Sequence, residues 1–188
     1  MTAAIIRRPF AKENARKNIF ALTTAAAFLA LGVLLPQVFH LALGPEGGKL
    51  FLPMHISVLL AGCLLGWHFG ALVGAVTPLL SFLLTGMPPM PMLFMMIAEL
   101  ALYGLACGLL RRNAKLPLLA ALPLALLAGR LVYAALLFLF VDRLHLLAVG
   151  GAATVLAAVA AGWPGIVVQL AVVPPLAKAM EKIMLNAQ

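Results

Sequence analysis

Between Leu50 and Leu110 the chain carries a single formally charged side chain, Glu99, and this constrains its fold more than any other feature. The rest of the segment is apolar but interrupted by Gly, Pro and His. So much apolar sequence cannot form a soluble core, and we expect it to lie in lipid. Helix breaks and charges are costly in lipid, so they usually mark a place where something is bound or moved.

The composition of the whole chain supports a membrane protein. Of 188 residues, 65% are hydrophobic and 10% charged, and the mean hydropathy is +1.14, whereas a soluble domain has roughly 25% charged residues. The net charge of +8 could suggest nucleic acid, but the basic residues lie between or outside the apolar segments, as cytoplasmic flanks do. We therefore expect a lipid bilayer and no nucleic acid as partner. The basic clusters are Arg7–Lys17, Arg111–Lys115 and Lys178–Lys182.

We predict an all-α fold: one polytopic membrane domain, 1–188, with six transmembrane helices in a compact bundle. The breaks between the spans are the loop Gly44–Lys49, the turn Gly66–Gly70 and the segment Gly86–Pro91, which has three prolines in four residues. The even number of spans places both termini and the basic clusters in the cytoplasm. The basic segment is 1–17, and the spans are approximately 18–41, 50–66, 69–86, 92–110, 116–141 and 147–177.

Two further features concern chemistry. Cys63 and Cys107 lie inside apolar segments at a spacing that fits no metal site, so we predict that they are small buried hydrophobic residues. The sequence has no HExxH, GxSxG or Walker lysine motif. We therefore predict no enzyme activity and no cofactor in this chain, and an ATP-driven transporter would need the ATPase of a partner.

Glu99 and Arg130 are ionisable residues inside predicted spans, where each costs a few kcal/mol alone. Both should therefore face the bundle interior. Arg130 could take an anionic group of a ligand and Glu99 a donor, or the two could pair structurally. His55, at the outer start of the second span, could donate to and accept from a ligand or satisfy a helix end.

Methionines gather around the proline break, at Met87, Met90, Met92, Met95 and Met96. Clustered thioethers can ligate Cu(I), but methionine is also a common gap-filling residue, so a flexible apolar wall around a ligand is favoured over a metal site. The predicted substrate-binding residues are His55, Met54, Glu99, Arg130, Met95, Tyr103 and Met87.

Small residues recur at a spacing of four on the first helix, in the pairs Ala21/Ala25 and Ala26/Ala30. Such spacing lets another helix approach closely in lipid, where packing drives association. These alanines are the predicted partner-binding residues.

Four segments carry a resemblance to a known family: LPMHISVLLAGCLLGWHFGALVGAVTPLLSFLLTGMPP, AELALYGLACGLL, AGRLVYAALLF and WPGIVVQLAVVPPL. In this order they resemble the substrate-binding S components of energy-coupling factor (ECF) transporters, from Leu50 to about Leu176. The resemblance implies a six-helix protein of the prokaryotic cytoplasmic membrane that binds a water-soluble vitamin or related micronutrient. The ligand would lie in the outer half of the bundle.

The resemblance also implies partners. An S component docks onto one transmembrane T subunit and two ABC ATPases, which use the ATP, and carries its ligand inward by reorienting in the membrane. In this family AxxxA spacing contacts the T subunit, which carries over to Ala21, Ala25, Ala26 and Ala30. Substrate candidates are pantothenate, a corrinoid, a pyridoxine-like or pyrimidine precursor, and folate. The alternatives are a copper permease that uses the methionines and a small membrane enzyme that uses His55 and Glu99.

Overall fold

The structure, a computed structural model, describes the backbone of residues 3–90, 92–140 and 162–186. It describes the side chains of residues 16–42, 44, 52–90, 92–140 and 162–184. Within these ranges the chain is helical and has no strand. The elements are α1 (Ala3–Phe51), α2 (Pro53–Leu65), α3 (Trp67–Thr85), α4 (Met92–Gly108), the π-helical turn η1 (Leu109–Asn113), α5 (Leu118–Phe138) and α7 (Trp163–Asn186).

The helices have the length and composition of membrane spans. Five segments in the described part of the chain are long and apolar enough to cross a bilayer: Arg16–Ala42, Trp67–Thr85, Met92–Asn113, Leu118–Phe138 and Trp163–Met184. The all-α multi-pass prediction is confirmed at this level, while six spans and the orientation of the termini stay predictions. The first half of the last predicted span, 147–161, lies outside the described residues.

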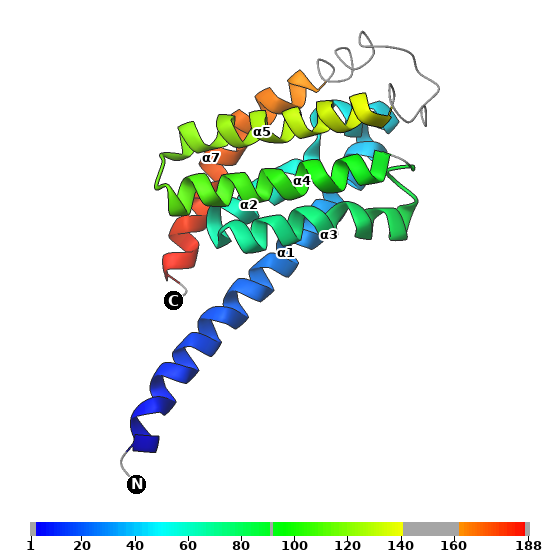
Figure 1. The fold of residues 1–188 in the computed structure, drawn as a ribbon. Coiled ribbons are helices and arrows are strands. Elements are labelled where there is room, and N and C mark those ends of the chain that lie inside the picture. Colours follow the sequence, from blue (N-terminus) through cyan, green and yellow to red (C-terminus); the bar gives the residue numbers. More distant parts are fainter. Residues whose placement is uncertain (1–2, 91, 141–161, 187–188) are drawn as a thin grey trace.

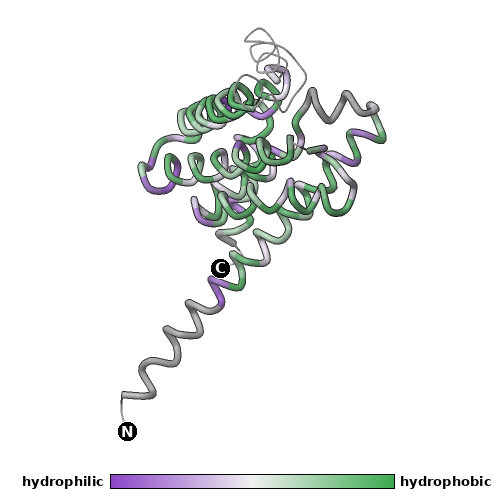
Figure 2. Tube along the Cα trace, turned by 45° about the vertical axis from the view of Figure 1, so that its right-hand side comes forward, coloured by the Kyte–Doolittle hydropathy of each residue, from purple (hydrophilic) through white to green (hydrophobic). Residues whose placement is uncertain are grey.

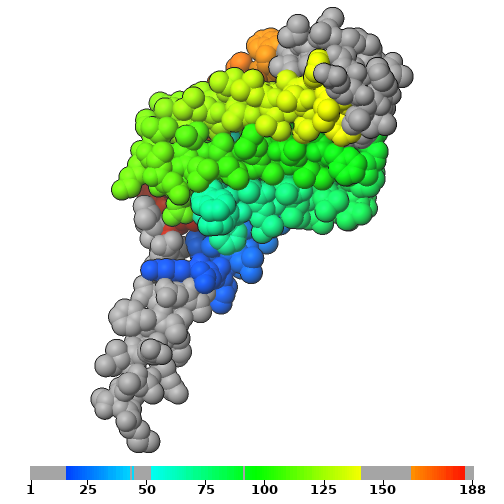
Figure 3. Space-filling view, in the orientation of Figure 1, coloured from blue at the N-terminus to red at the C-terminus, as the bar shows by residue number. Residues whose placement is uncertain are grey.

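Helix α2 is the centre of the bundle. It contacts α1, α3, α4 and α7, and nearly all of its residues are buried. A helix that is apolar on all sides belongs inside a protein. Because the other helices surround it, α2 can lie in the bundle although its 13 residues are fewer than a membrane span needs. Helices α3, α4 and α5 lie side by side and form one continuous face (Figures 1 and 3). The N-terminal half of α1 projects beyond the bundle (Figure 1). Hydrophobic residues follow the helices, and hydrophilic residues lie mainly at turns and helix ends (Figure 2).

The breaks between helices depend on glycine. Gly66, with a φ of 100°, separates α2 from α3, and Gly86, with a φ of 73°, ends α3 before the prolines. Positive φ is readily adopted only by glycine. The predicted loop Gly44–Lys49 is instead a break at Gly44 alone, where φ is 73° and ψ is −178°, and the helix resumes beyond it.

Glycines also let α2, α3 and α4 pack backbone against backbone. A Cβ added at Gly104 would overlap the backbone carbonyl of Gly70, and one at Gly74 would overlap that of Leu100. Gly62 faces Gly104 in the same way. Such close approach supplies the packing that drives helix association in lipid.

The close approach joins the two cysteines. Cys63 and Cys107 form a disulfide between α2 and α4, with their Cα atoms 5.5 Å apart. The prediction that they are merely small hydrophobic residues was wrong. The glycines beside them, Gly62, Gly104 and Gly108, bring the helices within the Cα distance that a disulfide needs.

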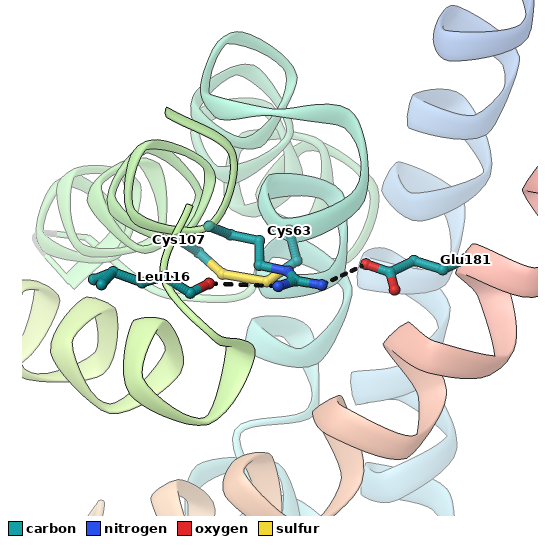
Figure 4. The surroundings of a disulfide bond; sticks show 5 residues. Cys63, Cys107, Leu116 and Glu181 are labelled. Atoms are coloured by element: carbon teal, nitrogen blue, oxygen red, sulfur yellow. Dashed lines mark hydrogen bonds and ion pairs between the residues drawn. A yellow bond between two sulfur atoms is a disulfide. The ribbon is translucent and has the colours of Figure 1, made fainter. Parts of the chain in front are cut away.

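Arginines hold the same end of the bundle. Arg111 donates from Nη1 to the carbonyl of Leu116 at 3.4 Å and from Nη2 to Glu181 at 3.1 Å, beside the disulfide (Figure 4). Arg112 donates to the carbonyl of Leu64 at 3.2 Å, near the C-terminus of α2. We call this the basic end. Its residues are Arg111, Arg112, Lys115, Lys178 and Lys182.

The glycine contacts give the first prediction. We expect Gly104→Ala to lower the stability of the detergent-solubilised protein by about 1–3 kcal/mol, because the added methyl meets rigid backbone that cannot move aside. Thermal unfolding measures the effect. Leu83→Ala, at a lipid-facing position that is 69% exposed, is the control, and an equal loss in both variants would contradict the close packing.

Candidate functional site

A cavity of about 340 Å³ lies at the end of the bundle opposite the basic end. It forms where the later part of α1, the start of α2, the connection from α3 to α4, and α5 converge. Small-molecule sites typically occupy about 300–1,000 Å³ and have mostly apolar walls with a few polar groups. The lining residues are Pro36, Gln37, His40, Leu52, Pro53, Met54, His55, Ser81, Met87, Pro88, Pro89, Met92, Met96, Glu99, Arg130, Tyr133 and Gly162.

The start of α2 is placed in the cavity wall by a sharp turn. Leu52 has a φ of 48° and a ψ of 50°, the left-handed conformation, which costs a non-glycine residue about 1–2 kcal/mol. Pro53 follows at the first position of α2, where its missing N–H leaves nothing unsatisfied. The carbonyl of Leu52 accepts from the His55 N–H at 3.1 Å. Met54 and His55 are thereby fixed at the wall.

Glu99 is the centre of the polar groups in the cavity. Its Oε1 accepts from the hydroxyl of Tyr103, one turn along α4, at 2.9 Å and lies 3.3 Å from Nη1 of Arg130. Its Oε2 lies 3.8 Å from Nε2 of His55, beyond hydrogen-bond range. The His55 and Tyr103 rings are 5.3 Å apart and tilted. All four side chains are buried, so three helices place their costly groups together.

Some polar atoms of these side chains have no hydrogen-bond partner. Neither ring nitrogen of His55 has a hydrogen-bond partner, and Nε and Nη2 of Arg130 have none. The guanidinium does lie 5.8 Å from the centre of the Tyr133 ring. Buried polar atoms are normally satisfied, and an unsatisfied set at a cavity marks a place for a ligand or water. The structure therefore shows polar binding capacity at this end of the bundle.

The predicted substrate-binding residues are distributed as follows. Met54, His55, Met87, Glu99 and Arg130 line the cavity. Tyr103 does not line it but holds Glu99 from behind. Met95 is fully buried in a separate core cluster with Leu137 of α5. Met95 lies one turn before Glu99, at the edge of the cavity-lining face of α4, and packs toward α5 instead of the cavity.

Several residues that line the cavity were not predicted from the sequence. Tyr133 lies one turn after Arg130 on α5, and Gln37 lies one turn before His40 on α1. Each lies three residues from another polar residue, and this spacing places the two side chains on the same face of a helix, which could have identified them. Gly162 carried no such signal, because only the fold brings it to Arg130.

The other predicted sites have clear positions. Ala25 is 3% exposed and packs in the protein's own core, Ala21 is half-buried, and Ala26 and Ala30 are exposed. Partner binding by these alanines stays a prediction. Among the described residues, no three His, Cys, Asp or Glu side chains gather where they could hold a metal ion.

A helical bundle with membrane-length apolar helices and a partly polar cavity at one end defines a multi-pass membrane protein that binds a small molecule. Residues 20–177 match the family described as the ECF transporter, substrate-specific component. The chain therefore belongs to this family, and the resemblance found in the sequence is confirmed. It is a family of transporter subunits and not of enzymes. No curated protein and no solved structure matches the chain.

The charged pair gives the second prediction. We expect Arg130→Met or Glu99→Leu alone to destabilise the ligand-free protein by about 3–5 kcal/mol, because each leaves an unpaired buried charge. The double variant Glu99→Leu/Arg130→Met should recover much of that loss. Thermal unfolding of the four proteins completes the cycle. Strictly additive losses would contradict direct pairing.

Proposed function

We propose that this chain is the S component of an ECF-type importer, which captures a water-soluble vitamin or related micronutrient in the cavity described above. The observation that carries the proposal is the set of buried, unpartnered groups of His55 and Arg130 in a mostly apolar cavity of small-molecule size. Partner ATPases would supply the energy, since the family is that of the substrate-specific component.

The basic end supports the proposed orientation. Arg111, Arg112 and Lys115 lie at the opposite end of the bundle from the cavity, and so do Lys178 and Lys182. Because Lys and Arg are in excess on cytoplasmic flanks, this arrangement supports an orientation with the cavity at the outer surface. An outward cavity can collect a ligand from outside the cell.

Reorientation in the bilayer is supported by the placement of charge. Within the helices α2, α3, α4 and α5 themselves, leaving out η1 and the turn after it, the only formally charged side chains are Glu99 and Arg130, and they are buried facing each other. The lipid-facing surface of these helices therefore has no charge to drag across the bilayer core, which would be costly. Docking to the T subunit would use the exposed Ala26 and Ala30 on α1.

The volume of the cavity favours the smaller substrate candidates over the larger ones. Its volume of about 340 Å³ equals roughly eleven water molecules at about 30 Å³ each. This favours pantothenate or a pyridoxine-like or pyrimidine compound over folate and over a corrinoid.

Native mass spectrometry of the detergent-purified protein tests the function. We expect a vitamin-sized organic molecule to co-purify. The alternative ligand is copper, which thioethers on the cavity wall could bind. These are Met54, Met87, Met92 and Met96. Bound copper would contradict the proposal. Turnover of a ligand by the isolated protein would favour the membrane enzyme.

The third prediction concerns binding. Arg130→Ala and Glu99→Ala should each weaken binding of the co-purifying molecule by on the order of 2–5 kcal/mol, because each removes a buried charged contact. Isothermal titration calorimetry measures the change, with Leu83→Ala as the lipid-facing control. Unchanged affinity in a folded variant would make that residue a structural member of the pair only.

The fourth prediction separates docking from binding. Ala26→Leu should block vitamin uptake by cells and co-purification of the T subunit while ligand binding stays intact, because the larger side chain holds the partner helix away. Ala135→Leu, at an exposed alanine on α5, is the matched control. Ala25→Leu should instead destabilise the protein, because Ala25 lies in its core. Normal uptake by Ala26→Leu would contradict docking through this face.

A further inference from the structure

One edge of the Arg130 guanidinium is left open. Nη1 lies 3.3 Å from Glu99, and Nε and Nη2 have no hydrogen-bond partner although the side chain is only 9% exposed. Gly162 lies against this open edge, since a Cβ added there would overlap Nη2. Both residues line the cavity. Nε and Nη2 of Arg130 are therefore buried, unpaired donors at the cavity wall, packed against a residue that has no side chain.

Gly162 also lies directly before α7, which begins at Trp163. Its carbonyl accepts the N–H of Ile166 at 3.2 Å, so the hydrogen bonding of the helix starts at Gly162. The first N–H groups of a helix have no partner within it, and they carry the positive end of the helix dipole. A Ser or Asp at this position would cap them with its side chain, whereas glycine cannot. The N-terminus of α7 and the open edge of Arg130 thus adjoin one another.

We propose that Arg130 and the N-terminus of α7 form a carboxylate subsite, and that Gly162 determines specificity because a side chain there would displace the guanidinium. A planar carboxylate matches the paired N–H groups of a guanidinium edge, and helix N-termini bind anions. This inference rests on the proposed function, since it names the class of substrate that the S component takes.

The charge balance favours a monoanion. Arg130 and Glu99 already compensate each other, so a carboxylate leaves one excess negative charge, and a dianionic phosphate would leave two in a buried site. The remaining wall is mainly methionine and proline. The substrate class is therefore a monocarboxylate with a largely apolar body.

Matched compounds test this inference. Calorimetry on the purified protein would compare pantothenate with panthenol and nicotinate with nicotinamide, pairs that differ at the carboxylate. We expect at least one carboxylate to bind on the order of 30-fold or more tightly than its neutral partner, as for a buried charge pair. Measurable but equal binding within a pair contradicts the subsite, and where no member binds, the native ligand described below decides.

Three variants assign the subsite to its residues. Arg130→Gln should abolish the preference for the carboxylate. Glu99→Gln should keep it, because Arg130 and Gly162 remain in place and the amide oxygen can still accept from Tyr103. Gly162→Ala should reduce the preference with little change in thermal stability, since its methyl displaces the flexible end of Arg130. A change of stability with an unaltered carboxylate-to-neutral ratio would make Gly162 merely structural and overturn its role.

The native ligand separates this inference from the proposed function. A co-purifying vitamin with a carboxylate supports both. A co-purifying vitamin without one overturns the subsite and leaves the S-component role in place. A protein that co-purifies with no vitamin and binds no member of the panel contradicts both.

Discussion

The buried pair of Glu99 and Arg130 is the interaction on which the rest of this structure depends. Each charge would be costly alone in lipid, so α4 and α5 must lie side by side with these residues facing each other. Tyr103 and His55 join the pair and draw in the start of α2. One electrostatic requirement therefore brings three helices together, places the polar groups at the cavity and keeps the charges of Glu99 and Arg130 away from the lipid-facing surface.

The two ends of the bundle differ in the residues they use. At the basic end Gly62, Gly70 and Gly104 let the backbones of α2, α3 and α4 touch. At the other end α2 and α4 carry methionines that line the cavity beside the proline-rich connection. The disulfide and the arginine contacts strengthen the basic end. The cavity thus lies opposite a closely packed end of the bundle.

Residues that are costly in lipid by themselves could be predicted from the sequence. Glu99, Arg130 and the helix break at Gly66 were identified from their chemistry alone, and the structure places the first two at the cavity. Prediction from the sequence failed where the meaning of a residue comes from a neighbour distant in sequence. The pairing of Cys63 with Cys107 is of this kind, and so is the contact of Gly162 with Arg130. Neither contact leaves a local pattern.

Structural pairing and ligand binding are compatible roles for Arg130, as the number of its donors shows. A guanidinium has five N–H groups in a planar fork, and Glu99 contacts it at Nη1. The other edge, Nε and Nη2, stays buried and unpartnered beside Gly162. Pairing with Glu99 therefore holds the side chain in one orientation without using the second edge. In the proposed binding role, a ligand would bring the missing acceptor to this edge.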